Sequence, residues 1–432
     1  FHMIILDTPE RRKIMASEDY KDIFCCIRCA ACLNVCPAFR LVGGHVYGGS
    51  IYTGGIGTLL TSFLNSRERG KDIQNICLQC GTCNTVCGGK LDIAGMILKL
   101  RTKFAQEDGL NPVHKFCLDT VADRHLFHSM LRIASVAQGM ITKGQPMIRH
   151  LPMFLSGLTA GRSLPSIAPQ PFRDILPTIK QDVPNPKGKI AIFTGCLLDF
   201  VYVDIATDVV KALNMAGYIV EMPLGQACCG APATYMGDVE NAKKAAELNL
   251  NAMEAEKYDY IVSACPTCTH ALRDYVDFFK DDPEMLKKAE ELRSKTFDFC
   301  KLVSMLGGLP DTGDGVPMKV TYHDSCHLNR YLGVTKEQRE LLKATKGVEL
   351  IEMHDCDKCC GFGGSYSVKF PEMSAPILEE KINNIVASGA DVVAVDCPGC
   401  LLQIRGGLDA RGLNNIQVKH TAQIVVEKRE KK

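Results

Sequence analysis

The sequence has almost no net charge and lacks a long hydrophobic run. Its 50 Lys and Arg residues are balanced by 49 Asp and Glu residues, so the formal charge is +1. Such a balance gives no electrostatic footprint for nucleic acid or for an anionic membrane surface. No apolar run reaches the roughly 18 residues of a membrane-spanning helix, and no secretory signal is evident. We expect a cytoplasmic protein with no transmembrane segment of its own, associated with a membrane only through a partner.

The sequence also lacks the short motifs that bind nucleotide cofactors. A glycine-rich stretch covers residues 43–55, but no strand pattern precedes it as in a dinucleotide-binding unit, and no Gly-Lys-Ser/Thr follows it. Without a flavin or nicotinamide fingerprint, hydride chemistry would belong to a partner. We expect the loop to pack its backbone around a metal centre, and a helix to follow over residues 93–105 with Arg101 on its polar face.

Cysteine is the residue in excess, with 22 in a chain of 432. A long chain without a secretory signal is a poor candidate for a disulfide scaffold. The number therefore favours metal ligation in a reducing compartment.

Two runs of four cysteines lie in the first quarter of the chain. Both have the spacing Cys-x2-Cys-x2-Cys-x3-Cys, and their members are Cys26, Cys29, Cys32 and Cys36, and Cys77, Cys80, Cys83 and Cys87. This is the spacing of bacterial ferredoxins, in which the fourth cysteine of each run crosses to the other cluster. It predicts two cubane [4Fe-4S] clusters, one on Cys26, Cys29, Cys32 and Cys87 and the other on Cys77, Cys80, Cys83 and Cys36. Zinc in a non-redox scaffold is the alternative, but a zinc knuckle does not need the third and fourth cysteine of each run.

A second cysteine pattern occurs twice in the C-terminal half. Each copy has a lone cysteine, a Cys-Cys-Gly triplet and a Cys-Pro-x-Cys, with ligand candidates Cys196, Cys228, Cys229, Cys265 and Cys268, and Cys326, Cys359, Cys360, Cys397 and Cys400. The return at an offset of about 130 residues indicates an internal duplication. Adjacent cysteines form a strained disulfide but can bridge neighbouring irons, and the glycine lets the backbone approach inorganic sulfide. We predict two further iron–sulfur clusters.

The residues around each copy alternate between strand and helix patterns. Strands are expected over 190–196, 218–224 and 260–264, and over 320–326, 348–353 and 392–395, with helices over 241–257 and 371–387. Such alternation implies a parallel sheet, whose ligands gather at the carboxyl ends of the strands. The cysteines of both copies fall at such ends.

The predicted fold class is an α+β ferredoxin-type two-cluster helical module followed by two duplicated α/β Cys-Cys-Gly domains with parallel sheets. The expected domains are 1–110 for the ferredoxin-type module, 111–187 for a helical and proline-rich connector, and 188–305 and 306–432 for the two copies.

Some candidate residues lie outside the ligand sets. His323 and His327 flank Cys326, and we expect them to cap the strand end and the helix start, with proton donation or tuning of a cluster as their candidate functional role. Four cysteines remain. We expect Cys25 to be a small buried hydrophobe and Cys300 to be inert, with Cys117 unassigned and Cys356 a candidate substitute ligand.

These motifs resemble those of known families. Residues 188–425, with the runs His323–His327 and Cys359–Gly364, resemble the Cys-Cys-Gly domains of heterodisulfide reductase catalytic subunits and of glycolate and lactate oxidoreductase iron–sulfur subunits. The segment from Cys26 to Gly57 resembles the ferredoxin part of the lactate-utilisation iron–sulfur oxidoreductases. In the disulfide reductases such cysteines hold non-cubane [4Fe-4S] clusters, and the resemblance implies the same option here.

The resemblance implies an iron–sulfur electron-transfer subunit of an oxidoreductase complex. A partner flavoprotein would oxidise lactate or a related 2-hydroxy acid, and the electrons would leave to a quinone or a soluble carrier. The alternative is a heterodisulfide reductase-like catalytic subunit that reduces a disulfide at the non-cubane clusters. The complete cysteine sets favour this alternative, whereas the N-terminal segment favours the first function.

Overall fold

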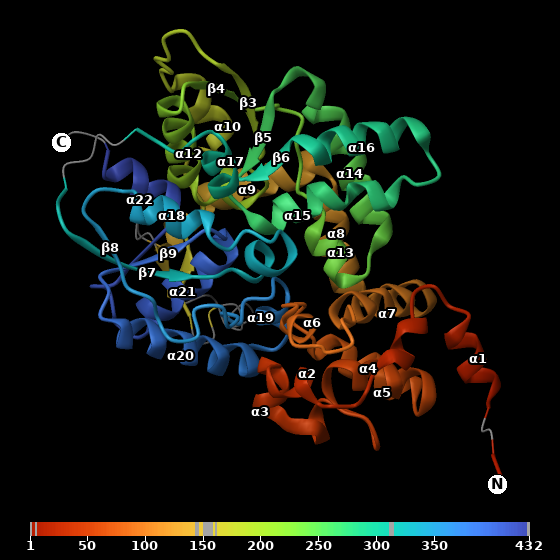
Figure 1. Cartoon of the computed structure of the whole chain (residues 1–432). Helices are drawn as coiled ribbons and strands as arrows, with labels where there is room; N and C mark the ends of the chain where they lie inside the picture. The colour runs from red at the N-terminus through yellow and green to blue at the C-terminus, as the bar shows by residue number, and fades with distance from the viewer. Residues whose placement is uncertain are drawn as a thin grey trace.

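The computed structural model describes residues 2–4, 7–142, 147–149, 159, 162–310 and 315–429, without the side chains of 140–142. Figure 1 shows a helical N-terminal module, coloured red and orange, beside two α/β units coloured green and blue. This arrangement confirms the predicted fold class.

The N-terminal module is built of short helices around the two cysteine runs. Its elements are α1 Pro9–Met15, η1 Lys21–Cys25, α2 Ala31–Asn34, α3 Pro37–Val46, α4 Gly54–Leu64, α5 Arg67–Ile73, η2 Gln74–Ile76, α6 Thr82–Thr85 and α7 Ile93–Asp108. Helices α4 and α7 pack together and bury Leu59, Ile97 and Phe104 in a small apolar core. The long helix α7 therefore supports the loops that carry the cysteines.

The connector contains helices α8 Pro112–Ala122, α9 Arg124–Thr142 and α10 Phe172–Ile175, the short turn η4 Leu176–Thr178, and the antiparallel pair β1 Met147–Ile148 and β2 Leu164–Pro165. Its described part from residue 162 onward lies against both α/β units. The backbone N–H of Ser163 donates to the carbonyl of Gly406 at 3.0 Å, and that of Ala168 donates to the carbonyl of Phe200 at 2.7 Å. Helix α8 packs on α14 of the first unit.

The first α/β unit has a four-stranded parallel sheet with the order β4-β3-β5-β6. Its strands are β3 Gly188–Ile192, β4 Tyr218–Glu221, β5 Tyr260–Ser263 and β6 Thr296–Asp298. Its helices are α11 Leu197–Phe200, α12 Val203–Met215, α13 Ala231–Met236, α14 Val239–Met253, α15 Pro266–Asp274, α16 Pro283–Lys295 and α17 Phe299–Met305, with the turns η5 Ala255–Lys257 and η6 Tyr275–Phe278.

The second unit repeats this topology, with the parallel order β8-β7-β9-β10. Its strands are β7 Met318–His323, β8 Val348–Leu350, β9 Val392–Val395 and β10 Gln417–Lys419. Its helical elements are the π-helical turn η7 His327–Tyr331 and helices α18 Glu337–Lys343, α19 Tyr366–Lys369, α20 Pro371–Ser388, α21 Pro398–Ala410 and α22 Thr421–Glu427. Each sheet thus has the three predicted strands, of which β9 has the predicted bounds and the others are shorter, and a fourth strand that the pattern missed.

Both units share one continuous apolar core. Helix α12 of the first unit packs on α22 of the second, and buried side chains from both sheets belong to the same cluster. The N-terminal module contacts both units, through α7 on α13 and through α3 on α20. Among the described residues, no helix combines the length and apolar character that crossing a bilayer requires.

A buried ion pair fastens the connector to the first unit. Arg173 of α10 donates from its backbone N–H to Asp199 Oδ1 at 3.0 Å and from Nε to Oδ2 at 2.7 Å. The side chains of Arg173 and Asp199 are 8% and 0% exposed. Burial raises the pKa of Asp199, which shows that its carboxylate depends on the guanidinium for compensation.

We expect Arg173→Met to lower the free energy of unfolding by about 3–5 kcal/mol, because it leaves the Asp199 carboxylate buried and uncompensated. Urea unfolding of the purified protein measures the effect. The control is Arg132→Met, which removes the half-exposed ion pair between Arg132 and Asp174 (2.7 Å) and should cost less than about 1 kcal/mol. Adding Asp199→Leu to Arg173→Met should restore much of the loss. Equal losses in the two single variants would show that the buried pair has no special role.

Candidate metal centres

Four thiols of the N-terminal module surround one cavity. Its volume is about 310 Å³, and the cysteines along its wall include Cys26, Cys29, Cys32 and Cys87. These are the four residues that the ferredoxin spacing assigns to one cubane cluster. The crossing of the fourth cysteine from one run to the other is therefore compatible with the backbone path.

Both cysteine runs have the same unusual backbone. One of the two residues between the first and second cysteines, and one of the two between the second and third, is left-handed in each run, with φ of 59° at Arg28 and 62° at Ala30, and 58° at Gln79 and 70° at Gly81. A left-handed backbone at a residue other than glycine is strained and persists where its surroundings hold it. Its recurrence in both runs shows that the loops wrap their thiols in the same way.

The glycine-rich stretch lies close to the first group of thiols, as we expected. A Cβ added to Gly55, in the first turn of α4, would lie 3.4 Å from Cys32 Sγ. Arg69 holds the preceding part of this stretch by donating to the carbonyls of Val46 and Gly48, both at 2.7 Å. The loop therefore brings its backbone to the edge of the cavity.

The cysteines of the second predicted cubane are half-buried, and their thiols influence one another. Burial and the charges of Cys80 and Cys77 raise the pKa of Cys36 to about 12. Burial and the charge of Cys359 raise the pKa of Cys80 to about 11. Such thiols lose their protons readily only when a cation compensates the charge, as iron does in a thiolate-ligated cluster.

The ten ligand candidates of the two α/β units all line a single cavity of about 340 Å³. In both units the lone cysteine follows the first strand, and the Cys-Pro-x-Cys follows the third strand and begins a helix, α15 or α21. The carboxyl ends of the two sheets therefore face a common space. The thiols of Cys265 and Cys397, one from each unit, are in hydrogen-bonding contact across it.

The packing around each Cys-Cys-Gly triplet explains why its third residue is glycine. Gly230 and Gly361 are left-handed, with φ of 79° and 85°. A Cβ on Gly361 would lie 2.8 Å from the carbonyl oxygen of Ser374 in α20, and one on Gly230 would lie 3.2 Å from that of Ala242 in α14. Close packing of α14 and α20 therefore excludes a side chain here, and the approach of the backbone to inorganic sulfide stays a prediction.

The donor set of these sites is almost entirely sulfur, as iron–sulfur clusters require. In the second unit, the contact with Cys359 and burial raise the pKa of Cys326. In the first unit, the contact with Cys228 and burial raise that of Cys196. Buried thiols that converge on one cavity fit a bound iron–sulfur group, because iron replaces the protons and supplies the compensating positive charge.

The second cysteine run lies against the second α/β unit. The charge of Cys80 contributes to the raised pKa of Cys326, and the charge of Cys359 contributes to the raised pKa of Cys80. Two residues of the turn η7 hold the junction. Arg330 Nη1 donates to the carbonyl of Cys80 at 3.3 Å, and Tyr331 Oη donates to that of Gln79 at 2.8 Å.

Arg101 makes the corresponding junction with the first unit, which sequence reasoning missed. Its guanidinium donates to the carbonyls of Gln74 (2.6 Å), Cys77 (3.1 Å) and Tyr235 (2.7 Å). The helical pattern placed it on a polar face, and no local signal shows that this face meets another unit.

Neither candidate histidine caps a helix or strand. His327 Nε2 lies 2.7 Å from Tyr235 Oη, and its ring stacks on Tyr331 with the centroids 5.0 Å apart. The ring of His270 lies beside both, and its Nδ1 is 3.1 Å from Asp274. Burial lowers the pKa of His323 to about 3, so its imidazole is neutral.

The four cysteines outside the ligand sets occupy different environments. Cys25 is exposed, so the expectation that it is a buried hydrophobe is wrong, although it lies at the wall of the N-terminal cavity. Cys300 is buried and Cys117 is exposed. Cys356 is half-buried, with its Sγ 3.6 Å from Arg339, and it is not part of the wall of the shared cavity.

Comparison with known proteins agrees with this arrangement. Residues 190–273 and 320–405 match the model of the cysteine-rich CCG domain, and residues 22–91 match that of the 4Fe-4S dicluster domain. Lactate utilization protein A of Shouchella clausii is 39% identical over 240 residues, which cover 55% of this chain and 99% of the relative. The chain belongs to the CCG-domain family of lactate utilization protein A. The probable glycolate oxidase iron-sulfur subunit of Bacillus subtilis is 29% identical over 428 residues, which cover 95% of this chain and 94% of that protein.

Membership of this family explains the two cysteine patterns together. The chain is an iron–sulfur protein and an electron-transferring subunit of an oxidoreductase, with a 4Fe-4S region followed by two CCG repeats.

We expect Cys360→Ala to lower the iron content and to alter the spectrum of one cluster, while the ferredoxin-type half remains reducible by dithionite. The reason is that Cys360 lines the shared cavity, far along the chain from the N-terminal cysteines. Cys300→Ala is the matched control, because Cys300 is equally buried but not part of the cavity wall. Iron analysis and visible absorption of the anaerobically purified variants are the measurements. Unchanged iron in Cys360→Ala would contradict its assignment as a ligand.

Proposed function

We propose that this protein transfers electrons within a complex that oxidises lactate or a related 2-hydroxy acid. A partner flavoprotein would carry out the oxidation and deliver electrons to the clusters. A quinone, reached through a membrane partner, or a soluble carrier would accept them. The names of the relatives, lactate utilization protein A and probable glycolate oxidase iron-sulfur subunit, support this substrate class.

The proposal assigns eighteen thiolates to four clusters. The two cubane [4Fe-4S] clusters take Cys26, Cys29, Cys32 and Cys87, and Cys77, Cys80, Cys83 and Cys36. The third and fourth clusters, which we propose to be non-cubane, take Cys196, Cys228, Cys229, Cys265 and Cys268, and Cys326, Cys359, Cys360, Cys397 and Cys400. We keep the domains at 1–110, 111–187, 188–305 and 306–432.

The observation that carries the proposal is the continuity of the thiols. Cys80 of the second cubane lies near enough to Cys326 to raise its pKa, and Cys359 lies near enough to Cys80 to raise the pKa of that thiol. At the far side of the shared cavity, Cys397 contacts Cys265 of the first repeat. Electrons can thus move between neighbouring centres from the N-terminal module through the second repeat to the first, in either direction.

Cationic side chains around the shared cavity would favour reduced clusters. Arg101 and Lys369 both belong to its wall, and burial with the nearby charge of Arg101 lowers the pKa of Lys369 to about 8. Arg330 lies beside the thiols of Cys80 and Cys326, whose charges raise its own pKa against the effect of burial. Positive charge and hydrogen bonds near a cluster stabilise the added electron and raise the reduction potential.

The heterodisulfide reductase-like alternative has less support. The relatives described above are named as lactate and glycolate proteins, and their matches cover 55% and 95% of this chain. The complete set of ten cysteines, which favours the alternative, is the support that remains for it.

We expect lactate to reduce the clusters anaerobically when the protein is bound to its flavoprotein partner. Bleaching of the visible cluster absorption measures the reduction, with lactate and glycolate compared as substrates. Iron and acid-labile sulfide should be near 16 each per chain, as four clusters of about four irons contain. Cys80→Ala should leave oxidation at the flavin with an artificial acceptor intact but stop reduction of the CCG clusters.

The control is Cys117→Ala, because Cys117 lies exposed on α8. It should behave as the native protein. Reduction of the clusters by a thiol with formation of a disulfide, but not by lactate with the partner, would favour the alternative function.

A further inference from the structure

The imidazole of His323 is buried without a partner. Among the described residues, neither Nδ1 nor Nε2 has a hydrogen-bond partner, and the residue is 0% exposed. Buried polar groups in folded proteins almost always have a partner, in the chain, in water or in a bound group. His323 is the last residue of β7 and lies at the same end of the sheet as Cys326. Its surroundings therefore indicate a bound group as the missing partner.

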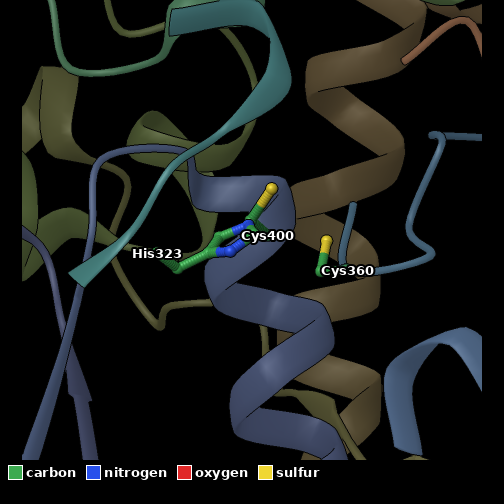
Figure 2. A group of neighbouring side chains, drawn as sticks. All are labelled: His323, Cys360 and Cys400. Carbon is green, nitrogen blue, oxygen red and sulfur yellow. The ribbon is translucent and has the colours of Figure 1, made fainter. Parts of the chain in front are cut away.

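Two thiols of the second repeat face this imidazole. A ring nitrogen of His323 and the Sγ atoms of Cys360 and Cys400 all lie within 4.8 Å of one another. Figure 2 shows that the three side chains come from three different segments, β7, the Cys-Cys-Gly turn and α21, and converge on one point. Metal bonds of about 2.0–2.3 Å hold tetrahedral N and S ligands within about 4 Å of each other. Small rotations would therefore let all three bind one iron.

The first repeat has no counterpart of this nitrogen. Three residues before its lone cysteine, where the second repeat has His323, it has Phe193. Phe193 is buried to the same degree. Its phenyl ring fills the position but cannot bind a metal. The two repeats thus share five thiols, and the second alone has a nitrogen donor at this place.

We propose that His323 is an imidazole ligand to iron in the cluster of the second repeat. The inference rests on the proposed function only in requiring that this repeat binds an iron–sulfur cluster. A neutral imidazole adds no negative charge to the cluster beyond that of its five thiolates, and in centres where histidine replaces cysteine the potential is higher. The two CCG clusters consequently differ in potential, and the second is the easier to reduce.

Isotope labelling of the native protein tests this ligand directly. The protein is prepared with 15N-histidine and with natural histidine, reduced in steps, and studied by pulsed EPR. We expect a strong nitrogen coupling on one reduced cluster that changes with the isotope. In His323→Phe, which copies the first repeat, the strong coupling should be lost and the midpoint potential of one cluster should shift to a more negative value.

His327→Phe is the matched control, because His327 lies at the cavity wall beside Cys326 but its Nε2 is in contact with Tyr235 Oη. It should keep the strong coupling. Loss of the coupling in this variant but not in His323→Phe would overturn the assignment. If the His323→Phe variant does not retain the cluster, the His323→Gln variant is used in its place. The labelled native protein shows independently whether a histidine binds the iron.

The outcomes also separate this inference from the proposed function. Full iron and sulfide content with only weak histidine coupling in the native protein would mean that His323 donates a hydrogen bond at most, and would overturn ligation while the proposed function stands. Strong coupling in a protein that lactate and the flavoprotein cannot reduce would support the ligand and count against the proposed function.

Discussion

The structure depends on one constraint, which is that many thiols must be withdrawn from water and still converge. A thiolate buried among other thiolates is unfavourable because it loses hydration and is repelled by its neighbours. Iron removes both penalties, since it replaces the protons and carries the opposing charge. The sites are therefore places where the chain is arranged for a bound cation, and the raised pKa of Cys36, about 12, reflects that arrangement.

The topology of the α/β units brings thiols from distant parts of the chain together. In a parallel sheet all strands end at the same edge, so loops that are distant in sequence meet there. Two such sheets with their carboxyl edges toward a common space double the number of thiols without a new fold. The contact between Cys265 and Cys397 shows how closely the two edges approach. Since both units also share one apolar core, we infer that their relative placement is as fixed as the packing within either unit.

Much of the fold and of the candidate cysteine sites could be predicted from the sequence, because cysteine spacing and strand–helix alternation are local patterns. The strands before Cys196 and Cys326 and the duplication follow from such patterns. The short strands β6 and β10 could not be recognised, since three residues carry no period and depend on the neighbouring strand for stability. Arg101 shows the same limit. Its position in the helical pattern is that of a solvated residue, and only tertiary contact gives its guanidinium the carbonyls of Cys77 and Tyr235.

Sequence differences between the two repeats make their cysteine sites unequal. The thiols are retained in both, but the residues beside the lone cysteine differ, with Phe193 and Leu197 in the first repeat and His323 and His327 in the second. The polar side chains thus collect in the repeat whose turn η7 contacts the second cysteine run through Arg330 and Tyr331. Hydrogen-bonding and ligating groups raise the potential of a nearby centre, whereas an apolar wall does not. A duplication that began with two equal halves can in this way become a sequence of unequal centres, which is what directed electron transfer requires.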